Sequence, residues 1–194
     1  MRAGAKFKAI GTLLALLAVA AAAGAAKIIV PDVNGAKVSP LEGKDRKATV
    51  LLFITNDCPI SNSYAPEFNR ICEAYKAKKI AFYLVYADLS LSAADAKQHS
   101  KEYGYTCPAL LDREHLLVKA TGATLTPEAA VLGPDGKLLY RGRIDDRYVD
   151  FGKARTQPTV RDLRDALDAI VQGKPVSHPF TKALGCTIPP LPQK

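Results

Sequence analysis

Apolar residues gather in two short runs that predict buried strands, with an amphipathic segment between them. The runs are ATVLLFIT at residues 48–55 and IAFYLVYAD at residues 80–88, and their β-branched and aromatic residues are typical of central strands. In the intervening segment 66–79 the apolar residues recur at helical spacing. That stripe consists of Phe68, Ile71, Cys72 and Tyr75. The pattern therefore predicts a strand–helix–strand unit.

The second half of the chain predicts two more helices and a hairpin. Segments 91–104 and 115–122 have helical patterns that end at glycines. Strands are expected at 127–133 and 136–142, because the sequence GPDG where they meet is a hairpin signal. This order of elements predicts an α/β fold, a central mixed β-sheet flanked by helices on both faces.

A last helix is expected over residues 160–172, followed by a tail. The apolar face of this helix consists of Val160, Leu163, Leu167 and Ile170. Thr159 followed by Asp162 predicts a cap at its start, and Gly173 marks its end. The remaining segment, 174–194, is rich in proline, so we expect an extended arm there.

The first 26 residues differ from the rest of the chain. Three basic residues precede an alanine-rich apolar run that ends in small residues, which is typical of a secretory signal peptide. We expect cleavage near Ala26, an extracytoplasmic mature protein and no stable membrane insertion, with an uncleaved anchor as the alternative. The remainder is then one domain at 27–173 with the arm at 174–194.

Composition argues against nucleic-acid and metal binding. The net charge of +8 falls to about +5 without the leader, and the remaining basic residues alternate with acids, as in RGRIDDRYVD, so no nucleic-acid partner is expected. The three histidines are scattered and the four cysteines lack C-x-x-C spacing, which predicts no metal site and no other cofactor. An even number of cysteines in an exported protein permits disulfides without choosing the partners.

The candidate chemistry lies in the stretch FITNDCPISNSYAPEF at residues 53–68. Its letters CPIS, from Cys58 to Ser61, followed by Pro66, resemble the thioredoxin active-site segment. In that family a C-x-x-C pair precedes a helix with a proline at this offset. The Thr-Pro pair that ends at Pro127 resembles the cis-proline loop that thioredoxin-like proteins place beside the reactive sulfur. The resemblance implies a thioredoxin-like fold.

A second resemblance is to the peroxiredoxins and the broader redoxin group. The letters TNDC, from Thr55 to Cys58, match the peroxiredoxin T-x-x-C, in which the threonine hydroxyl helps to bind peroxide. The stretch YTCPALLDREHLLVKATGA is similar to a redoxin pattern that leads into a short helix. Together these resemblances cover about residues 48–142.

Several positions depart from both patterns. Leu51 stands where peroxiredoxins have a proline, and Glu128 lies near the place of their peroxide-binding arginine, for which Arg141 or Arg143 could substitute. On the thioredoxin side, Asp57 replaces the usual tryptophan and serine replaces the second cysteine. Disulfide exchange is therefore favoured over peroxide reduction, and a self-contained dithiol enzyme is not expected.

Cys58 is the predicted nucleophile. At the end of a strand and the start of a helix, backbone N–H groups and the helix dipole favour the thiolate, although the neighbouring Asp57 opposes a second negative charge. Thr55 and Ser61 would polarise or hydrogen-bond the sulfur, and Pro127 would shape the substrate groove. The alternative is a buried, inert cysteine at the end of a core strand.

The other three cysteines have different expected roles. Cys72 lies on the helical stripe, which favours core packing. For Cys107, core packing and disulfide pairing both stay open. Cys186, in GCTIPP, resembles the C-terminal resolving cysteine of two-cysteine peroxiredoxins; the alternative is a static disulfide to Cys107 or Cys72.

The sequence thus predicts an exported thioredoxin-like thiol–disulfide oxidoreductase. Its partners would be protein thiols and disulfides, with an external thiol reductant to regenerate it. The alternatives are a peroxiredoxin-type peroxidase acting on peroxide, and a non-catalytic binding module with the same fold. Outside the candidate site, Asp145, Asp146 and Arg147 are expected to form a solvated, ion-paired loop, and Tyr64 and Tyr148 to line a groove.

Overall fold

A computed structural model describes residues 27–43 and 45–193 of the chain. The predicted signal peptide at residues 1–26 lies outside this part. None of the described helices is long and apolar enough to cross a membrane.

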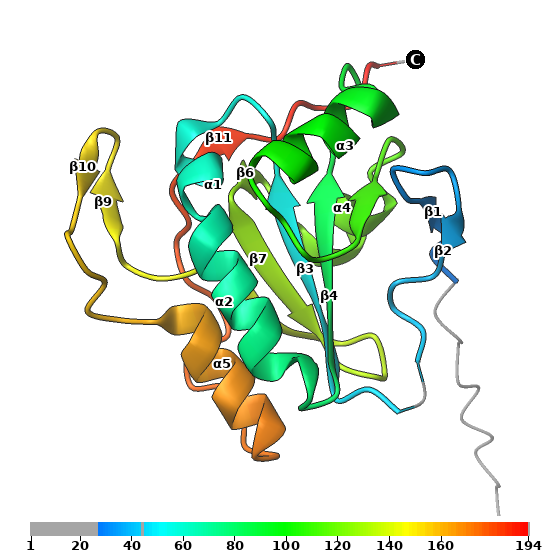
Figure 1. The fold of residues 1–194 in the computed structure, drawn as a ribbon. Coiled ribbons are helices and arrows are strands. Elements are labelled where there is room, and N and C mark those ends of the chain that lie inside the picture. Colours follow the sequence, from blue (N-terminus) through cyan, green and yellow to red (C-terminus); the bar gives the residue numbers. More distant parts are fainter. Residues whose placement is uncertain (1–26, 44, 194) are drawn as a thin grey trace, which may run out of the picture.

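A five-stranded mixed sheet forms the centre of the molecule, with the strand order β5-β4-β3-β7-β8 (Figure 1). Its strands are β3 (Ala48–Ile54), β4 (Ile80–Tyr86), β5 (Ala109–Leu111), β7 (Glu128–Leu132) and β8 (Leu138–Gly142). β4 is parallel to β3 and β5, whereas β7 is antiparallel to β3 and forms a hairpin with β8. The predicted central strands and hairpin are confirmed. β3 is buried along its whole length because elements cover both of its faces.

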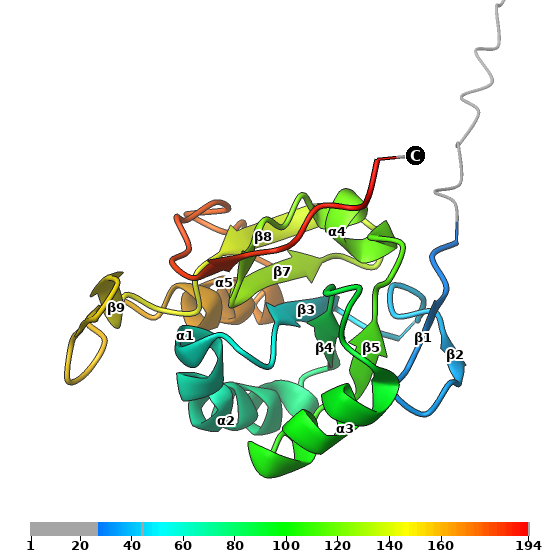
Figure 2. The same ribbon diagram turned by 90° about the horizontal axis from the view of Figure 1, so that it is seen from above.

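Helices cover both faces of the sheet, as predicted (Figure 2). The helices are α2 (Ala65–Lys76), α3 (Ala93–Glu102), α4 (Leu116–Thr121), α5 (Asp162–Val171) and the short α1 (Pro59–Ser63). Alternate residues of β3 point to opposite faces and so contribute to two separate cores. Leu52 packs with residues of α2 and α5, including Phe68 and Leu167. Leu51 packs on the other face with Leu117 of α4.

The start of α5 differs from the prediction. Thr159 does not cap this helix, because its hydroxyl donates instead to the carboxylate of Asp146. Asp162 forms an ion pair with Arg143, with 2.7 Å between Arg143 Nε and Asp162 Oδ2. Val160 precedes the helix and is 41% exposed, so it does not belong to the apolar face. The segment before α5 is therefore held by side chains from the loop after β8.

Three short strand pairs lie outside the central sheet. They are β1 (Val30–Pro31) with β2 (Lys37–Val38), β9 (Tyr148–Asp150) with β10 (Lys153–Ala154), and β6 (Leu125–Thr126) with β11 (Cys186–Thr187). The β9–β10 hairpin projects from the body of the molecule, and its Val149 and Phe151 are exposed (Figures 1 and 2). None of these pairs was predicted, because strands of two or three residues carry no measurable periodicity.

None of the described residues after α5, 172–193, is helical, and this segment returns along the outer edge of the sheet beside β8 (Figure 2). The backbone of Arg141 in β8 accepts a hydrogen bond from Thr181 N and donates one to Pro179 O. Further along, Ile188 is buried in the α4 side of the core. These contacts carry the arm across the molecule to β6.

Candidate active site

Cys58 lies at the junction of β3 and α1. It occupies the N-cap position of α1, and Pro59 takes the first helical turn, where a missing N–H costs nothing. The Cys58 side chain is fully buried. Its Sγ donates a hydrogen bond to the backbone oxygen of Thr126, 3.2 Å away. The nucleophile predicted from sequence is therefore in contact with the predicted cis-proline loop.

The peptide bond between Thr126 and Pro127 is cis, as the resemblance to thioredoxin-like proteins implied. Pro127 connects β6 to the central strand β7. Because β7 pairs with β3, the loop that contains Pro127 reaches the same end of the sheet as Cys58. The sequence correctly identified both loops of the site.

The C-terminal arm brings a second free sulfur to Cys58. β11 pairs antiparallel with β6, so that Cys186 lies opposite Thr126. The Thr126 hydroxyl also donates to the backbone oxygen of Cys186, at 3.3 Å. Cys186 Sγ donates a hydrogen bond to Cys58 Sγ, with 2.8 Å between the sulfurs. The structure thus places together three of the predicted site residues, Cys58, Pro127 and Cys186.

The surroundings of Cys186 make it a weak acid. Burial raises the pKa of this thiol to about 11, and the hydrogen bond to Cys58 and the nearby charges of Cys58 and Asp57 act in the same direction. At neutral pH Cys186 is therefore a protonated thiol that can donate to the neighbouring sulfur.

Thr55 and Ser61 lie near Cys58 in the chain but bond elsewhere. The Thr55 hydroxyl donates to Asp57 Oδ1 at 2.9 Å. Ser61 is fully buried, and its Oγ has no hydrogen-bond partner among the described residues. In the described part of the chain, the hydrogen bonds of the Cys58 sulfur are those to Thr126 and Cys186. A polarising role for the two hydroxyls stays a prediction.

The two arginines that could have supplied positive charge to Cys58 are bound to other groups. Arg141 forms an ion pair with Glu128, with 3.4 Å between Arg141 Nε and Glu128 Oε1, and donates to backbone oxygens near α4. Arg143 pairs with Asp162. Glu128, at the position where the peroxiredoxin arginine is expected, is buried and accepts from the N–H groups of Thr124 and Leu125.

Cys72 and Cys107 form a disulfide, which corrects the expectation for Cys72 and decides the open alternatives for Cys107 in favour of pairing. Core packing alone was expected for Cys72. Its sulfur is instead bonded to Cys107, so that the disulfide connects α2 with the segment that precedes β5. The helical stripe showed the face on which Cys72 lies and not which group that face meets. The bond also excludes the static alternative for Cys186, because neither Cys72 nor Cys107 is free to pair with it.

With the site described, comparison with known families becomes informative. The sequence matches the family model for Redoxin over residues 4–157, most of its length. The chain belongs to the Redoxin family. The redoxin resemblance seen in the sequence is therefore confirmed. No curated protein matches the sequence of this redoxin.

Solved structures resemble this redoxin over most of its length. A hypothetical protein from Sinorhizobium meliloti is 29% identical, with a TM-score of 0.73, and the match covers 84% of this chain and 91% of that one. A conserved protein from Geobacillus kaustophilus is 28% identical, with a TM-score of 0.73 and coverage of 86% and 89%. A secreted disulfide oxidoreductase from Mycobacterium tuberculosis is 18% identical, with a TM-score of 0.51 and coverage of 76% and 96%. The last likeness shows a shared thioredoxin-like fold.

A buried polar chain that the sequence did not indicate supports the loop before Cys58. His99 of α3 lies with Nδ1 2.7 Å from Tyr86 Oη and Nε2 2.9 Å from Asn62 Oδ1. The Asn62 amide donates in turn to the backbone oxygen of Asn56 at 2.8 Å. Burial lowers the pKa of His99, so the neutral ring, with one donor and one acceptor, suits these partners. A lone histidine in a helical pattern gives no signal for such a role.

The loop after β8 was expected to be solvated and ion-paired. The solvation is wrong, because Asp145 and Asp146 are both buried, whereas Asp146 does form an ion pair, with Arg155. Asp145 accepts a hydrogen bond from the Tyr64 hydroxyl. Burial and this carboxylate raise the pKa of Tyr64 well above its ordinary range.

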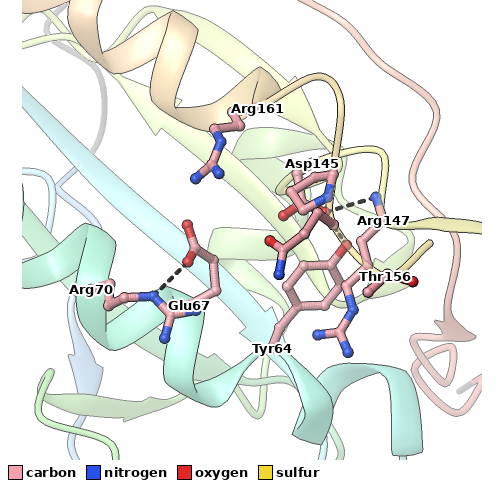
Figure 3. A pocket seen from close by; sticks show the side chains of 9 residues that line it. Tyr64, Glu67, Arg70, Asp145, Arg147, Thr156 and Arg161 are labelled. Atoms are coloured by element: carbon pink, nitrogen blue, oxygen red, sulfur yellow. Dashed lines mark hydrogen bonds and ion pairs between the residues drawn. The ribbon is translucent and has the colours of Figure 1, made fainter. Parts of the chain in front are cut away.

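Tyr64 and Asp145 border a cleft of about 460 Å³ (Figure 3). The cleft is lined by Tyr64, Glu67, Arg70, Asp145, Arg147, Thr156, Gln157, Pro158 and Arg161. Tyr64 and Tyr148 together border only a small cavity of about 10 Å³ beside Pro127.

No group of three or more His, Cys, Asp or Glu side chains within 27–43 and 45–193 is arranged to hold a metal ion.

Proposed function

We propose that this redoxin is an exported thiol–disulfide oxidoreductase in which Cys58 attacks and Cys186 resolves. The observation that carries the proposal is the 2.8 Å separation of the two free sulfurs. A disulfide bond is about 2.05 Å long, so a small movement of the arm is enough to form one. This closeness depends on the pairing of β11 with β6, which joins the tail to the cis-proline loop.

The hydrogen bonding supports Cys58 as the nucleophile of the pair. In the contact between the sulfurs Cys186 is the donor and Cys58 the acceptor. Once Cys58 gives up the proton that it donates to Thr126 O, the neighbouring S–H can therefore stabilise the negative charge on its sulfur. The raised pKa of Cys186 keeps that proton in place at neutral pH.

The proposed cycle consists of two exchange steps. In the first, the Cys58 thiolate attacks one sulfur of a substrate disulfide, forming a mixed disulfide and releasing the other substrate sulfur as a thiolate. In the second, Cys186 loses its proton and attacks Cys58 Sγ, so that the second substrate sulfur leaves and the Cys58–Cys186 disulfide forms. An external dithiol or pair of thiols then reduces this disulfide and is itself oxidised.

Access to Cys58 requires movement of the arm. The Cys58 side chain is fully buried, with the backbone of Thr126 on one side and Cys186 on another. When β11 leaves β6, the backbone groups of Thr126 become free beside Pro127, and an extended substrate segment can pair with them instead. This supports the expected part of Pro127 in shaping the groove.

Disulfide exchange is the better-supported activity of the two thiol chemistries considered. A peroxidase of the expected kind needs a cation at the sulfur, whereas Arg141 and Arg143 form ion pairs with Glu128 and Asp162. The Thr55 hydroxyl, expected to contact peroxide, donates to Asp57. Neither arrangement prepares the site for peroxide.

Export is part of the proposal. The leader at 1–26 has the pattern of a signal peptide cleaved near Ala26, and the fold is shared with an oxidoreductase described as secreted. The Cys72–Cys107 disulfide also fits an extracytoplasmic protein, since such bonds persist outside the reducing cytosol.

The test compares two activities of the reduced mature protein, reduction of a protein disulfide and consumption of hydrogen peroxide, in the parent and in Cys58→Ser. We expect disulfide reduction in the parent and its loss in Cys58→Ser, with slow peroxide consumption in both. The Ser177→Ala variant, an exposed change on the same arm and away from both sulfurs, serves as the matched control and should retain activity. Fast Cys58-dependent peroxide consumption would establish the peroxidase instead, and absence of both activities would favour the binding module.

A further inference from the structure

The sulfur of the pair that faces solvent is not the proposed nucleophile. Cys58 is fully buried, whereas Cys186 is partly exposed. Beside Cys186 lies a hollow of about 130 Å³, large enough for the end of a small thiol. The hollow is lined by Ile54, Thr55, Asp57, Ala87, Asp88, Thr126, Cys186, Thr187, Ile188 and Pro189. Cys58 does not belong to this lining, so an external group meets Cys186 first.

The charged groups in the hollow have one sign. Asp57 and Asp88 line it, and its lining contains no lysine or arginine. Both carboxylates are held in place by hydrogen bonds, Asp57 by the Thr55 hydroxyl and Asp88 by the backbone and hydroxyl of Ser90. Within the part of the chain that the structure describes, neither carboxylate forms an ion pair. A thiol that enters the hollow therefore meets uncompensated negative charge.

We propose that the external reductant reaches the Cys58–Cys186 disulfide through this hollow, attacks Cys186, and is selected as a neutral or cationic thiol over an anionic one. The inference rests on the proposed function, because it concerns how the disulfide formed there is reduced. It assigns Asp57 and Asp88 a role in choosing the electron donor.

The exchange steps balance in atoms and electrons. A reductant thiolate attacks Cys186 Sγ, the Cys58–Cys186 bond breaks, and Cys58 leaves as a thiolate while the reductant becomes bonded to Cys186. A second thiolate, from the same dithiol or from a second molecule, then attacks the reductant sulfur and releases Cys186. The reductant is oxidised to a disulfide, and the protein gains two electrons.

The chemistry of the leaving sulfur agrees with this direction. Attack at Cys58 would expel Cys186, whose thiol pKa is raised chiefly by burial, and sulfurs of high pKa are poor leaving groups. Attack at Cys186 expels Cys58 instead, so Cys186 does not have to leave in this step. Access and leaving-group chemistry thus favour the same sulfur.

The first experiment locates the attack. The oxidised mature protein is mixed with cysteamine and quenched at short times with an alkylating reagent, and the adducts are mapped by mass spectrometry. The expected early product has cysteamine on Cys186 and the alkyl group on Cys58. The reverse assignment would overturn the inference.

The second experiment measures charge selection. Rate constants per thiolate for cysteamine, 2-mercaptoethanol and 3-mercaptopropionate are compared in the parent and in Asp57→Asn/Asp88→Asn, which keeps an oxygen to accept each hydrogen bond. The ratio of cysteamine to mercaptopropionate should be about tenfold larger in the parent at low salt, and the difference should shrink at high salt. The variant supplies the reference for intrinsic differences between the thiols. The Asp150→Asn variant, on the distant β9–β10 hairpin, should behave as the parent.

The outcomes separate the two proposals. If oxidation of the parent yields no Cys58–Cys186 disulfide, the proposed function fails and this inference fails with it. If the disulfide forms and is reduced with the same charge ratio in parent and variant, the role of Asp57 and Asp88 is refuted while the proposed function stands.

Discussion

The two cysteine pairs of this redoxin differ in the parts of the fold on which their cysteines lie. Cys72 and Cys107 are 35 residues apart in sequence and connect α2 with the segment before β5, both parts of the folded body. Cys58 and Cys186 are 128 residues apart, and one of them belongs to an arm that reaches β6 through a two-residue strand. A bond within the body restrains the fold, whereas a bond to an arm can open and close while the sheet stays intact. The difference suits the first pair for stability and the second for turnover.

The largest difference between the two cysteine pairs should appear in turnover when Cys186 is removed. We expect Cys186→Ser to lower disulfide-reductase turnover roughly 100-fold or more, because Cys58 can still attack but the mixed disulfide has no internal thiol to resolve it. Non-reducing electrophoresis and mass spectrometry should show the trapped substrate complex. The double variant Cys72→Ser/Cys107→Ser is the control and should turn over normally; a matching loss there would remove the distinction between the pairs.

The same double variant should show the opposite effect on stability. Closing a loop of this length is expected to stabilise the folded protein by about 4 kcal/mol, through the lower entropy of the unfolded chain. Urea denaturation of Cys72→Ser/Cys107→Ser and of reduced Cys186→Ser measures this. We expect a much smaller change in the free energy of unfolding for Cys186→Ser, and equal stabilities for parent and double variant would contradict the structural role.

The packing of the arm against β6 can be perturbed while both sulfurs are kept. A Cβ on Gly185 would lie within 2.7 Å of the backbone carbonyl carbon of Thr126, which is anchored in β6 and cannot yield as a flexible side chain could. We expect Gly185→Ala to slow closure of the Cys58–Cys186 disulfide about tenfold, and the rate is followed by alkylation of the free thiols. Thr187→Ala is the control in the same strand. Unchanged closure in Gly185→Ala would show that the sulfurs meet by another route.

The docked thiol of Cys186 should make its own contribution to the alkaline pH dependence of stability. The pKa of Cys186 is raised to about 11 in the folded protein, above the value near 9 of a free thiol, so the folded state holds this proton more tightly than the unfolded state does. The resulting stability is complete below pH 9 and is lost as the pH rises towards 11. Urea midpoints of the reduced protein at pH 8 and pH 10.5 should therefore fall more in the parent than in Cys186→Ser. Equal decreases would show that the docked thiol contributes nothing to the pH dependence.

The sequence was informative where a pattern is long or tied to a motif. The apolar runs of β3 and β4 predicted the central strands. The motif around Cys58 and the Thr-Pro pair at Pro127 predicted two loops that the structure brings into contact. Pairing of Cys72 with Cys107 could not be predicted, because helical spacing shows a direction and not the group that lies there. Thr159 illustrates a second limit, since a residue type that caps helices also binds a carboxylate brought from another loop.

The role of the arm was predicted only from its resemblance to a peroxiredoxin tail. Its path depends on contacts that a local pattern does not contain, including the bonds between Arg141 and the backbone at Pro179 and Thr181. The pairing of β11 with β6 involves two residues on each side, below the length at which alternation can be recognised. Cys186 therefore lies beside Cys58 because of tertiary contacts along the arm, and these contacts leave no periodic pattern in the sequence.

The pairing of β11 with β6 also has a consequence for concentrated solutions. An arm that leaves its own β6 exposes a short strand edge, and the arm of a second copy carries the same residues in the same order. Two chains can then exchange arms, each placing its Cys186 beside the Cys58 of the other and closing two disulfides between subunits. We therefore expect oxidation at higher protein concentration to give a larger share of covalently linked, arm-exchanged dimer relative to closed monomer.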